Sequence, residues 1–542
     1  MFSASRLLAA LCAASALLLT EAQSGASIIA GSPVSAVWPP ANATDTALDI
    51  FFPDASEIGH PGATPTGDEA FAVQTAPSAP LKEDILPLIA PGGAQVVISD
   101  NATTPFDVAR SWGNLSPYWS LGGAWGLPNT SEIIPAGCEL TQAHLLHRHG
   151  ARYPTSGGPP AVFASKIQAA ANSTGFNATG PLAFLNTWTY ELGAEYDLGV
   201  AFRVKYGNLL KGFTDLPVFR TTSERTLNFA AGFFGVPTYQ TAYHQSIMIE
   251  DTGFFSSLAP WNSCPNANNA ISSLGSLASA NWTAVYLNDT VARLQPFIEG
   301  VTLDTATVMQ MQMTCAYETE EWKGFEYAYD LSLWYGNGPG NPVTASLGAA
   351  WSAELLARLT QTPPTNFTAT AMNGTLDGSN ITFPLTQPLY VDATHDTVIS
   401  TITTALNLTT MAAAGPLPVD RVQPNQTYFG NQVVPFGSNL IAQVMSCPTI
   451  ASNSTTASSS SSYAPAAADS TTQYIRFLLN DGVVPLTGLA HCETPNSDGL
   501  CALTNFVQGL AERLAEIDFE FDCFANYSAP VPDLIVDGRM KK

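Results

Sequence analysis

The sequence predicts an α/β fold, in which a mostly parallel sheet is flanked by helices and carries an inserted, smaller helical subdomain. Short apolar or β-branched runs alternate along the chain with longer segments of helical spacing, and strands that alternate with helices typically form a parallel sheet. Two stretches, within about 155–215 and about 255–385, are longer than a crossover connection requires. We therefore expect the helical subdomain to lie within these two stretches.

Individual elements follow from the same pattern. The strand-like runs are AHLLHRH at 143–149, LPVFR at 216–220, PLYVDATHD at 388–396 and YIRFLLND at 474–481. The helical segments are 223–235, 348–360 and 503–517. One face of the last helix is apolar and consists of Leu503, Phe506, Val507, Leu510 and Leu514.

Composition divides the rest of the chain. Residues 1–22 combine an early arginine, a short apolar run and a small-residue exit at Ala22, which is the pattern of a cleaved secretory signal peptide. Residues 23–105 are rich in proline, alanine and glycine, and we expect a mostly irregular extension there. The main domain is expected over 106–530, with a serine-rich, glycosylated surface insertion at 452–472.

Several features indicate export. No segment after the signal peptide is apolar enough to form a transmembrane helix, so we expect a secreted, extracellular protein. Fifteen Asn-x-Ser/Thr sequons fit a secreted glycoprotein. In an oxidising compartment most of the cysteines that remain after signal removal should pair, with one left over. These cysteines, too dispersed for a zinc site, are Cys138, Cys264, Cys315, Cys447, Cys492, Cys501 and Cys523.

The charge of the chain excludes two classes of partner. The sequence has 44 Asp and Glu against 20 Lys and Arg, which gives a formal net charge of −24 at pH 7. A protein this acidic repels nucleic acid and anionic membranes, so we expect neither as a partner. The charge suits an acidic medium, in which protonation of some carboxylates relieves their mutual repulsion.

The segment HLLHRHGARYP at 144–154 concentrates three histidines and two arginines in a chain with few basic residues. A zinc site would use His147 and His149, which share one face of a strand, but the neighbouring arginines repel a cation. The planar arginine fork binds phosphate oxygens, and Gly150 lets the backbone approach an anion closely. His149, between Arg148 and Arg152, is suited to attack phosphorus in line. The segment therefore predicts a phosphate site that needs no metal or other cofactor.

The motif RHGARYP at 148–154 resembles the signature of the histidine acid phosphatases. The resemblance continues in the order of that family through 111–123, 219–233, 327–360, 390–400 and 476–486, which include SWGNLSPYWSLGG, FRTTSERTLNFAAGF and YVDATHDTVIS. It covers roughly residues 106–525 and is closest to the fungal secreted phytase and acid phosphatase branch. It implies a phosphoglycerate-mutase-like fold and a phosphomonoesterase that uses no cofactor.

The resemblance also implies a role for each site residue. His149 is the nucleophile, and Asp396 protonates the leaving alcohol. The residues implied to bind the substrate phosphate are Arg148, Arg152, Arg220 and His395.

The sequence itself supports part of this assignment. Arg220 ends a strand-like run and precedes a helical segment, where a helix N-terminus also favours anions. His395 and Asp396 follow an apolar strand, at the carboxyl end where open α/β sheets bind ligands. A bound phosphate raises the pKa of an adjacent carboxyl group, so Asp396 can hold a proton in acid and donate it. The same aspartate can then deprotonate the hydrolytic water.

Other polar residues are expected to have structural roles or lack supporting context. The histidines assigned to packing or supporting roles are His144, His147 and His491. His60 and His244 have no supporting context. Arg225, one helical turn beyond Arg220, is expected to be structural, and Asp330 is interpreted as a solvated helix acid rather than a substrate contact.

Disulfide pairing follows partly from spacing and partly from the resemblance. Cys492 and Cys501 are close enough in sequence to close a small loop. The resemblance implies a bond between Cys138 and Cys447. A bond between Cys264 and Cys523 then completes three bridges, and Cys315 is left unpaired.

The expected function is a secreted acid phosphatase with broad specificity for small phosphate monoesters, able to use phytate. No basic residue follows the signature before Lys166, so recognition of further phosphate groups should be weak. The alternative is a dedicated phytase. A phosphoglycerate-mutase-like phosphotransferase shares the chemistry, but the signal peptide and the sequons oppose a glycolytic role. A catalytically silent glycoprotein is disfavoured because all six site residues are intact.

Overall fold

The computed structural model describes residues 108–150, 159–187, 202–203, 205–222, 226–235, 241–248, 250, 254–311, 317–448, 471–528 and 534–540. The expected signal peptide and the N-terminal extension lie outside these residues. So do Arg152, Arg225, Cys315 and all of the serine-rich insertion except its last two residues, Thr471 and Thr472. None of the helices in the described ranges is long and apolar enough to cross a membrane.

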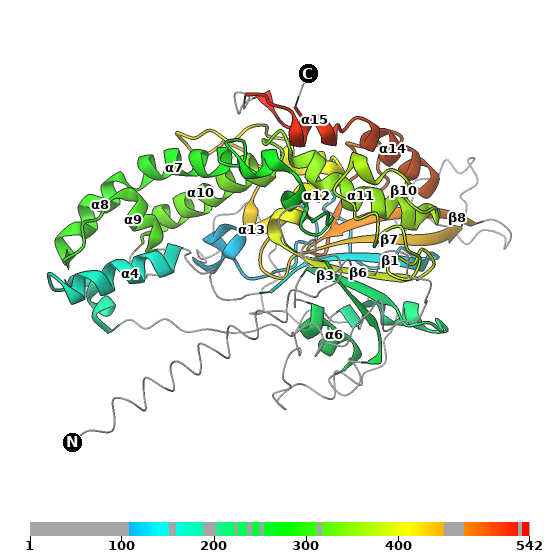
Figure 1. The fold of residues 1–542 in the computed structure, drawn as a ribbon, viewed down its shortest axis with the longest axis horizontal. Coiled ribbons are helices and arrows are strands. Elements are labelled where there is room, and N and C mark those ends of the chain that lie inside the picture. The colour runs from blue at the N-terminus through cyan, green and yellow to red at the C-terminus, as the bar shows by residue number, and fades with distance from the viewer. Residues whose placement is uncertain are drawn as a thin grey trace.

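An eight-stranded mixed sheet forms the centre of the molecule (Figure 1). Its order is β10-β8-β7-β1-β6-β3-β4, and β9 pairs with β8. The parallel part consists of β1 (Glu139–Arg148), β3 (Val218–Thr222), β4 (His244–Met248) and β6 (Leu389–Thr394). The antiparallel part consists of β7 (Asn439–Pro448), β8 (Thr471–Leu479), β9 (Gly482–Val484) and β10 (Cys501–Ala502). The four strand-like runs of the sequence are confirmed as β1, β3, β6 and β8.

Strand β1 lies at the junction of the two parts of the sheet. It pairs in parallel with β6, with Arg148 opposite Thr394, and in antiparallel with β7, with His147 opposite Asn439. Because β1, β3 and β6 run in parallel, their carboxyl ends meet at one edge of the sheet. That edge carries the end of the RHG motif and the His395-Asp396 pair.

Helices cover both faces of this sheet (Figure 1). One face is covered by α11 (Thr344–Thr360), α12 (Asp396–Ala405) and α14 (Leu503–Ala515), and the other by α6 (Thr226–Phe234). The three helical segments of the sequence are confirmed as α6, α11 and α14. On α14, Phe506 and Leu510 are buried as its periodicity predicts, while Leu503, Val507 and Leu514 are half-buried.

A second group of helices extends from one side of the sheet (Figure 1). It contains α4 (Pro159–Asn172), α7 (Leu274–Tyr286), α8 (Asn288–Leu294), α9 (Thr305–Gln310) and α10 (Thr319–Asn337). At the start of α10, Glu318 and Glu321 form a capping box that satisfies backbone donors. One difference from the expected subdomain is that α11, inside 255–385, packs on α12 and α14 and so belongs to the sheet layers.

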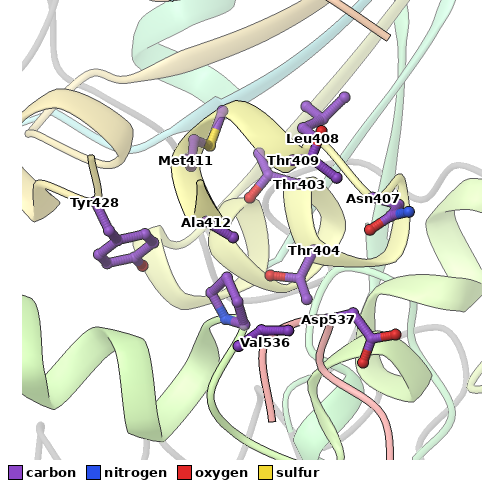
Figure 2. Close-up of a pocket in the computed structure, with 11 residues that line it drawn as sticks. Thr403, Thr404, Asn407, Leu408, Thr409, Met411, Ala412, Tyr428, Val536 and Asp537 are labelled. Carbon is purple, nitrogen blue, oxygen red and sulfur yellow. The ribbon is translucent and has the colours of Figure 1, made fainter. Parts of the chain in front are cut away.

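The C-terminal segment docks beside α11 and α12 (Figure 2). The backbone nitrogen of Ala345 donates to the carbonyl of Gly538 at 2.9 Å, and Gly538 in turn donates to Pro339 at 2.9 Å. A small pocket lies between this segment and the last turn of α12, lined by Thr404 and Asp537 among others. Helix α12 begins at Asp396, at the sheet edge that carries the His395-Asp396 pair, and the pocket lies at its other end. The length of the helix therefore separates the pocket from that edge by about 15 Å.

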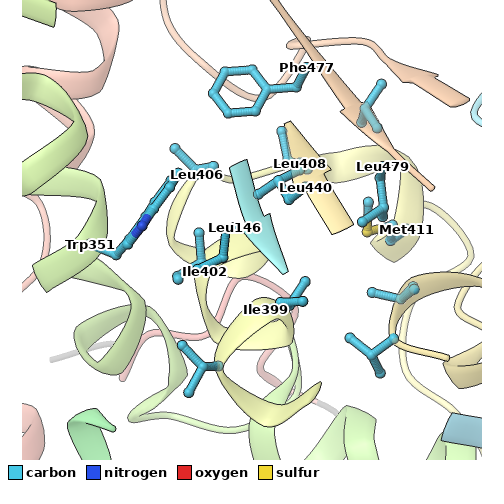
Figure 3. Close-up of a cluster of buried hydrophobic side chains, with 14 of the residues drawn as sticks. Leu146, Trp351, Ile399, Ile402, Leu406, Leu408, Met411, Leu440, Phe477 and Leu479 are labelled. Carbon is cyan, nitrogen blue, oxygen red and sulfur yellow. The ribbon is translucent and has the colours of Figure 1, made fainter. Parts of the chain in front are cut away.

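A hydrophobic cluster fixes the elements that carry the site (Figure 3). Leu146 of β1 packs with Ile399 and Ile402 of α12, and Trp351 of α11 closes one side. All four side chains are fully buried. Burial of each such side chain stabilises the fold by about 1.5–3 kcal/mol, so β1 and α12 are held firmly against one another.

The described residues contain three disulfides, and they are the three expected pairs. Cys138 and Cys447 join the segment before β1 to the end of β7. The other bonds are Cys264–Cys523 and Cys492–Cys501. Cys315 lies outside the described residues, so its expected free thiol remains a prediction.

Candidate active site

The end of β1 positions His149. Its backbone nitrogen donates to the carbonyl of Thr394 at 3.1 Å, and its own carbonyl accepts from Gly437 at 3.1 Å. The strand therefore remains tied to β6 on one side and to the loop before β7 on the other. His149 is buried.

The ring nitrogens of His149 differ in role. Nδ1 lies 2.8 Å from the carbonyl oxygen of Gly150. A carbonyl only accepts hydrogen bonds, so this contact places the proton on Nδ1. Nε2 is then the nitrogen that carries the lone pair, as a nucleophile requires.

Arg148 points toward Asp396. Its guanidinium lies 2.9 Å from Oδ2 of Asp396 and donates to the carbonyls of Val434, at 2.7 Å, and Asn114. The guanidinium also stacks over the ring of Phe436, at 4.2 Å from the ring centroid. Because Arg148 is buried and oriented by these neighbours, its charge is fixed at this edge of the sheet.

Asp396 accepts a second strong hydrogen bond from Asn114, whose Nδ2 lies 2.6 Å from its Oδ2. Burial favours the neutral form of the carboxyl group, but Arg148, Asn114 and the backbone nitrogen of Thr397 outweigh burial and lower the pKa of Asp396 to about 2. The carboxyl group is therefore ionised in this structure throughout the mildly acidic range. A general acid with this pKa needs a change in its surroundings before it can hold a proton.

His395 lies beside these groups at the N-terminus of α12. Its ring centroid is 5.8 Å from that of His149, and the ring of Trp261 contacts it edge-on at 5.3 Å. Nε2 of His395 lies 2.8 Å from a carboxylate oxygen of Glu250. This carboxylate orients the imidazole.

Arg220, expected in the phosphate clamp, pairs with a different set of groups in this structure. Its guanidinium is buried among carboxylates, 2.7 Å from Asp392 and 2.5 Å from Glu354, with Asp377 at 3.5 Å. Arg358 binds the other oxygen of Asp392 at 2.8 Å. The direction of the Arg220 side chain is set by acids on α11 and β6, which the local sequence around Arg220 does not contain.

The remaining arginines of the motifs lie outside the described residues. Arg152 follows His149 by three positions, and Arg225 follows Thr222, the last residue of β3, by three positions. Thr222 lies at the edge of the sheet where β1 and β6 end. Arg225 is therefore the next arginine after the carboxyl end of β3.

Two histidines of β1 have packing roles, as expected. His144 stacks on Tyr390 at 4.7 Å, and burial together with Arg358 keeps its pKa well below the usual value. His147 stacks on Phe229 of α6 at 4.7 Å. His491 lies on the surface, 3.1 Å from Glu512.

Asp330 differs from its interpretation as a solvated helix acid. The side chain is buried, and it accepts from the backbone nitrogen of Gly430 at 2.7 Å and from Gln426 at 2.6 Å. Burial raises the pKa of Asp330 to about 7, since these two hydrogen bonds only partly offset it. Its role is to hold α13 (Gly430–Val433) against α10.

The sequence analysis missed two contributors to the site, Asn114 and Glu250. Asn114 lies in the SWGNLSPYWSLGG segment but counts there as a glycosylation sequon. Its amide contact with Asp396 joins residues 282 positions apart. Glu250 lies just beyond β4, at the sheet edge, and only the pairing of β4 with β3 could have indicated it. Within the described part of the chain, no cluster of three or more His, Cys, Asp or Glu side chains is arranged to hold a metal ion.

Comparison with known proteins is consistent with this geometry. Residues 139–480 match the family model of the histidine phosphatase superfamily (branch 2). The phytase A of Aspergillus oryzae is 30% identical over 447 residues, which cover 74% of this chain and 88% of that protein. The phytase A of Aspergillus fumigatus is 30% identical over 445 residues, which cover 74% and 87%. The crystal structure of the phytase from D. castellii shares the fold, with a TM-score of 0.57 at 23% identity over 82% of this chain and 94% of that chain.

Proposed function

Because the chain belongs to branch 2 of the histidine phosphatase superfamily, we propose that it is a secreted acid phosphatase that hydrolyses phosphate monoesters through a phosphohistidine intermediate. One observation carries the proposal: His149, Arg148 and Asp396 lie at one sheet edge, where the guanidinium of Arg148 contacts the carboxylate of Asp396. These groups supply a nucleophile, a phosphate-binding cation and a proton carrier. We infer that its substrates are small phosphorylated molecules.

In the first step, Nε2 of His149 attacks phosphorus and the bond from phosphorus to the ester oxygen breaks. The leaving oxygen takes a proton from Asp396 and departs as an alcohol. The proton on Nδ1, held by Gly150, stays on the ring while the N–P bond exists. In the second step, Asp396 takes a proton from water, the resulting hydroxide oxygen bonds to phosphorus, and Nε2 regains its lone pair.

Arg148 connects substrate binding to the protonation of Asp396. A phosphate group competes with Asp396 for this guanidinium and places its own negative charge beside the carboxylate. Both effects raise the pKa of Asp396 from its value of about 2. Asp396 therefore acquires its proton when the substrate binds. We assign further phosphate contacts to His395 and, from the sequence, to Arg152.

The lysines of the chain support broad specificity. Of the four described lysines, Lys211 is exposed, whereas Lys166 donates to Thr307 at 2.7 Å and Lys205 binds Glu132 and Asp481. Lys323 pairs with its neighbour Glu320 on α10. Cations already engaged in this way hold additional phosphate groups weakly, so we infer that phytate is accepted without strong preference.

A dedicated phytase is the alternative function, and the similarity to two fungal proteins named phytase A favours it. The two functions differ in the ratio of kcat/KM for phytate to kcat/KM for simple monoesters. A preference for phytate of about a hundredfold, or about 2.7 kcal/mol of selective transition-state binding, would establish the dedicated phytase.

The test of the proposed function uses the secreted protein and its His149→Ala variant, each assayed on an aryl phosphate and on phytate in acid. We expect activity on both substrates in the wild type and a loss of several orders of magnitude in the variant. The intermediate should be trapped by alkaline quenching, which preserves phosphohistidine. If the wild-type protein were inactive on both substrates, the catalytically silent glycoprotein would be supported instead. Trapped phosphate on a serine rather than on His149 would exclude this mechanism.

A further inference from the structure

The outward face of α7 exposes two large apolar side chains. Leu277 is 59% exposed and Val285 is 51% exposed, whereas Ala278 and Trp282 of the same helix are buried. The buried side packs against α10, and α7 lies along the outer side of the helical subdomain (Figure 1). Exposed leucine and valine on one helix face favour association with other apolar surfaces.

Asn281 lies between these two residues in sequence and on the helix surface. It follows Leu277 by four positions and precedes Val285 by four, and residues with this spacing are neighbours on a helix. Its side chain is exposed, and it begins the sequon Asn281-Trp282-Thr283. We call Leu277, Asn281 and Val285 the α7 stripe.

We propose that Asn281 carries an N-linked glycan whose first sugars cover the α7 stripe. The proposal rests on the expected export of the protein, because the donor is a lipid-diphosphate-linked oligosaccharide of the secretory membranes. A bond forms between Nδ2 of Asn281 and C1 of the first sugar, while the bond from C1 to the diphosphate oxygen breaks. The amide gives up one proton and the lipid diphosphate departs, so no oxidant or reductant is needed.

Other sequons differ from Asn281 in their surroundings. The amide of Asn114 donates to Asp396 inside the candidate site, and that of Asn373 is buried and donates to the carbonyl of Phe255 at 3.1 Å. A glycan on either amide disrupts these contacts. Asn172, at the exposed end of α4, has no large exposed hydrophobic residue among the described side chains of its helix, so it offers a matched control.

The experiment compares secreted proteins produced in a yeast host. Peptide mapping by mass spectrometry before and after enzymatic removal of N-glycans reports the occupancy of Asn281. Self-association is then followed by light scattering for the wild type, Asn281→Gln and the control Asn172→Gln. A third variant combines Asn281→Gln with Leu277→Gln and Val285→Gln, which removes the apolar stripe while retaining good helix formers.

We expect Asn281 to be occupied, and Asn281→Gln to aggregate several-fold faster than Asn172→Gln, with activity on an aryl phosphate retained. The triple variant should return to the wild-type rate. Three results would overturn the proposal: an unmodified Asn281 in the secreted protein, equal aggregation of the two single variants, or a wild-type dimer that the stripe substitutions dissociate. The last result would identify a second copy as the cover of this face.

Discussion

In the proposed mechanism Asp396 acts as an acid despite its low pKa, and Arg148 makes this possible. With its pKa near 2, Asp396 has lost its proton at pH 5. A bound dianion draws Arg148 toward itself and adds a like charge, and both changes favour the protonated carboxyl group. Binding of an anion must then take up a proton from the solvent.

This coupling gives a prediction for sulfate, which mimics phosphate and has no proton to give at pH 5. We expect the wild type to take up about one more proton per sulfate bound than the Asp396→Asn variant does. Calorimetric titration in buffers of different ionisation enthalpy measures this difference. Equal uptake by the two proteins would show that Asp396 does not change its protonation on binding.

Arg220 gives a second prediction at this scale. The Arg220→Met variant keeps the apolar volume but leaves Asp392 and Glu354 partly uncompensated in the interior. Loss of one partner of a buried ion pair costs about 3–5 kcal/mol, so we expect a loss of this size in the free energy of unfolding. Denaturant titration of both proteins provides the measurement.

The matched variant is Arg225→Met, since Arg225 is the next arginine after Arg220 in the sequence. If Arg225 rather than Arg220 serves the substrate, this variant should lose activity at nearly unchanged stability. An Arg220→Met protein of wild-type stability and no activity would restore Arg220 to the phosphate clamp.

The positions of the candidate site residues could be predicted to different extents. Arg148 ends β1, His149 follows it, and Asp396 lies just beyond β6, so the local strand patterns could place all three at one sheet edge. Arg220 also ends a strand, but its guanidinium direction depends on Glu354, far away in the chain. Asn114 was missed for the same reason, because its partner becomes a neighbour only in the folded protein.

At the scale of elements, helix α10 carries two acids one turn apart, the half-buried Glu326 and the buried Asp330. Burial raises the pKa of Glu326 well above its usual value, with Asp330 as a further cause. Around them lie Ser111, Gln426 and Asn431, together with the backbone nitrogen of Gly430. This arrangement joins α10 to α13, whose neighbour Val434 supplies a carbonyl to Arg148.

The sign of the resulting pH dependence follows from the proton count. The folded protein keeps the Asp330 proton up to about pH 7, whereas the unfolded chain loses it near the ordinary value of about 4. The folded state therefore binds more protons between these values, and stability falls as the pH rises through them. For a shift of this size the loss is about 4 kcal/mol at most.

The Asp330→Asn variant tests this dependence. Its amide oxygen can still accept from Gly430, but it has no charge to develop. We expect the variant to be close to the wild type at pH 4 and more stable than it at pH 8, by melting temperature. If the melting temperatures of the two proteins changed equally with pH across this range, Asp330 would not be the source of the pH dependence.

Elements were predicted best where one pattern was sufficient. The amphipathic face of α14 and the apolar runs of β1, β3, β6 and β8 can be recognised from the pattern of apolar residues in the sequence. Strand β7 is buried along most of its length and lacks the alternation that marks a half-buried strand. The assignment of α11 to the sheet layers depends on what it packs against, which sequence periodicity does not reveal.

On the scale of the whole molecule, two of the disulfides close very long loops. Cys138–Cys447 and Cys264–Cys523 span 309 and 259 residues, whereas Cys492–Cys501 spans 9. Loop-closure entropy grows with the logarithm of loop length, which gives about 5–6 kcal/mol for the long loops and about 2–3 kcal/mol for the short one.

Paired alanine substitutions test this difference. We expect Cys264→Ala with Cys523→Ala to destabilise the protein by about 2–3 kcal/mol more than Cys492→Ala with Cys501→Ala. Equilibrium unfolding under non-reducing conditions gives both values. A larger loss from the short-loop pair would mean that local packing, rather than chain entropy, governs these bonds.

Strands β1 and β6 pair in parallel but lie far apart in the chain, and this separation has a consequence during translation. His149 and Asp396 are about 250 residues apart in the chain, and translation adds roughly 5–20 residues each second. If His149 and Asp396 have the proposed roles, a nascent chain contains its nucleophile for roughly 10–50 s before its acid has been made. During that interval the proposed reaction cannot take place on the growing polypeptide.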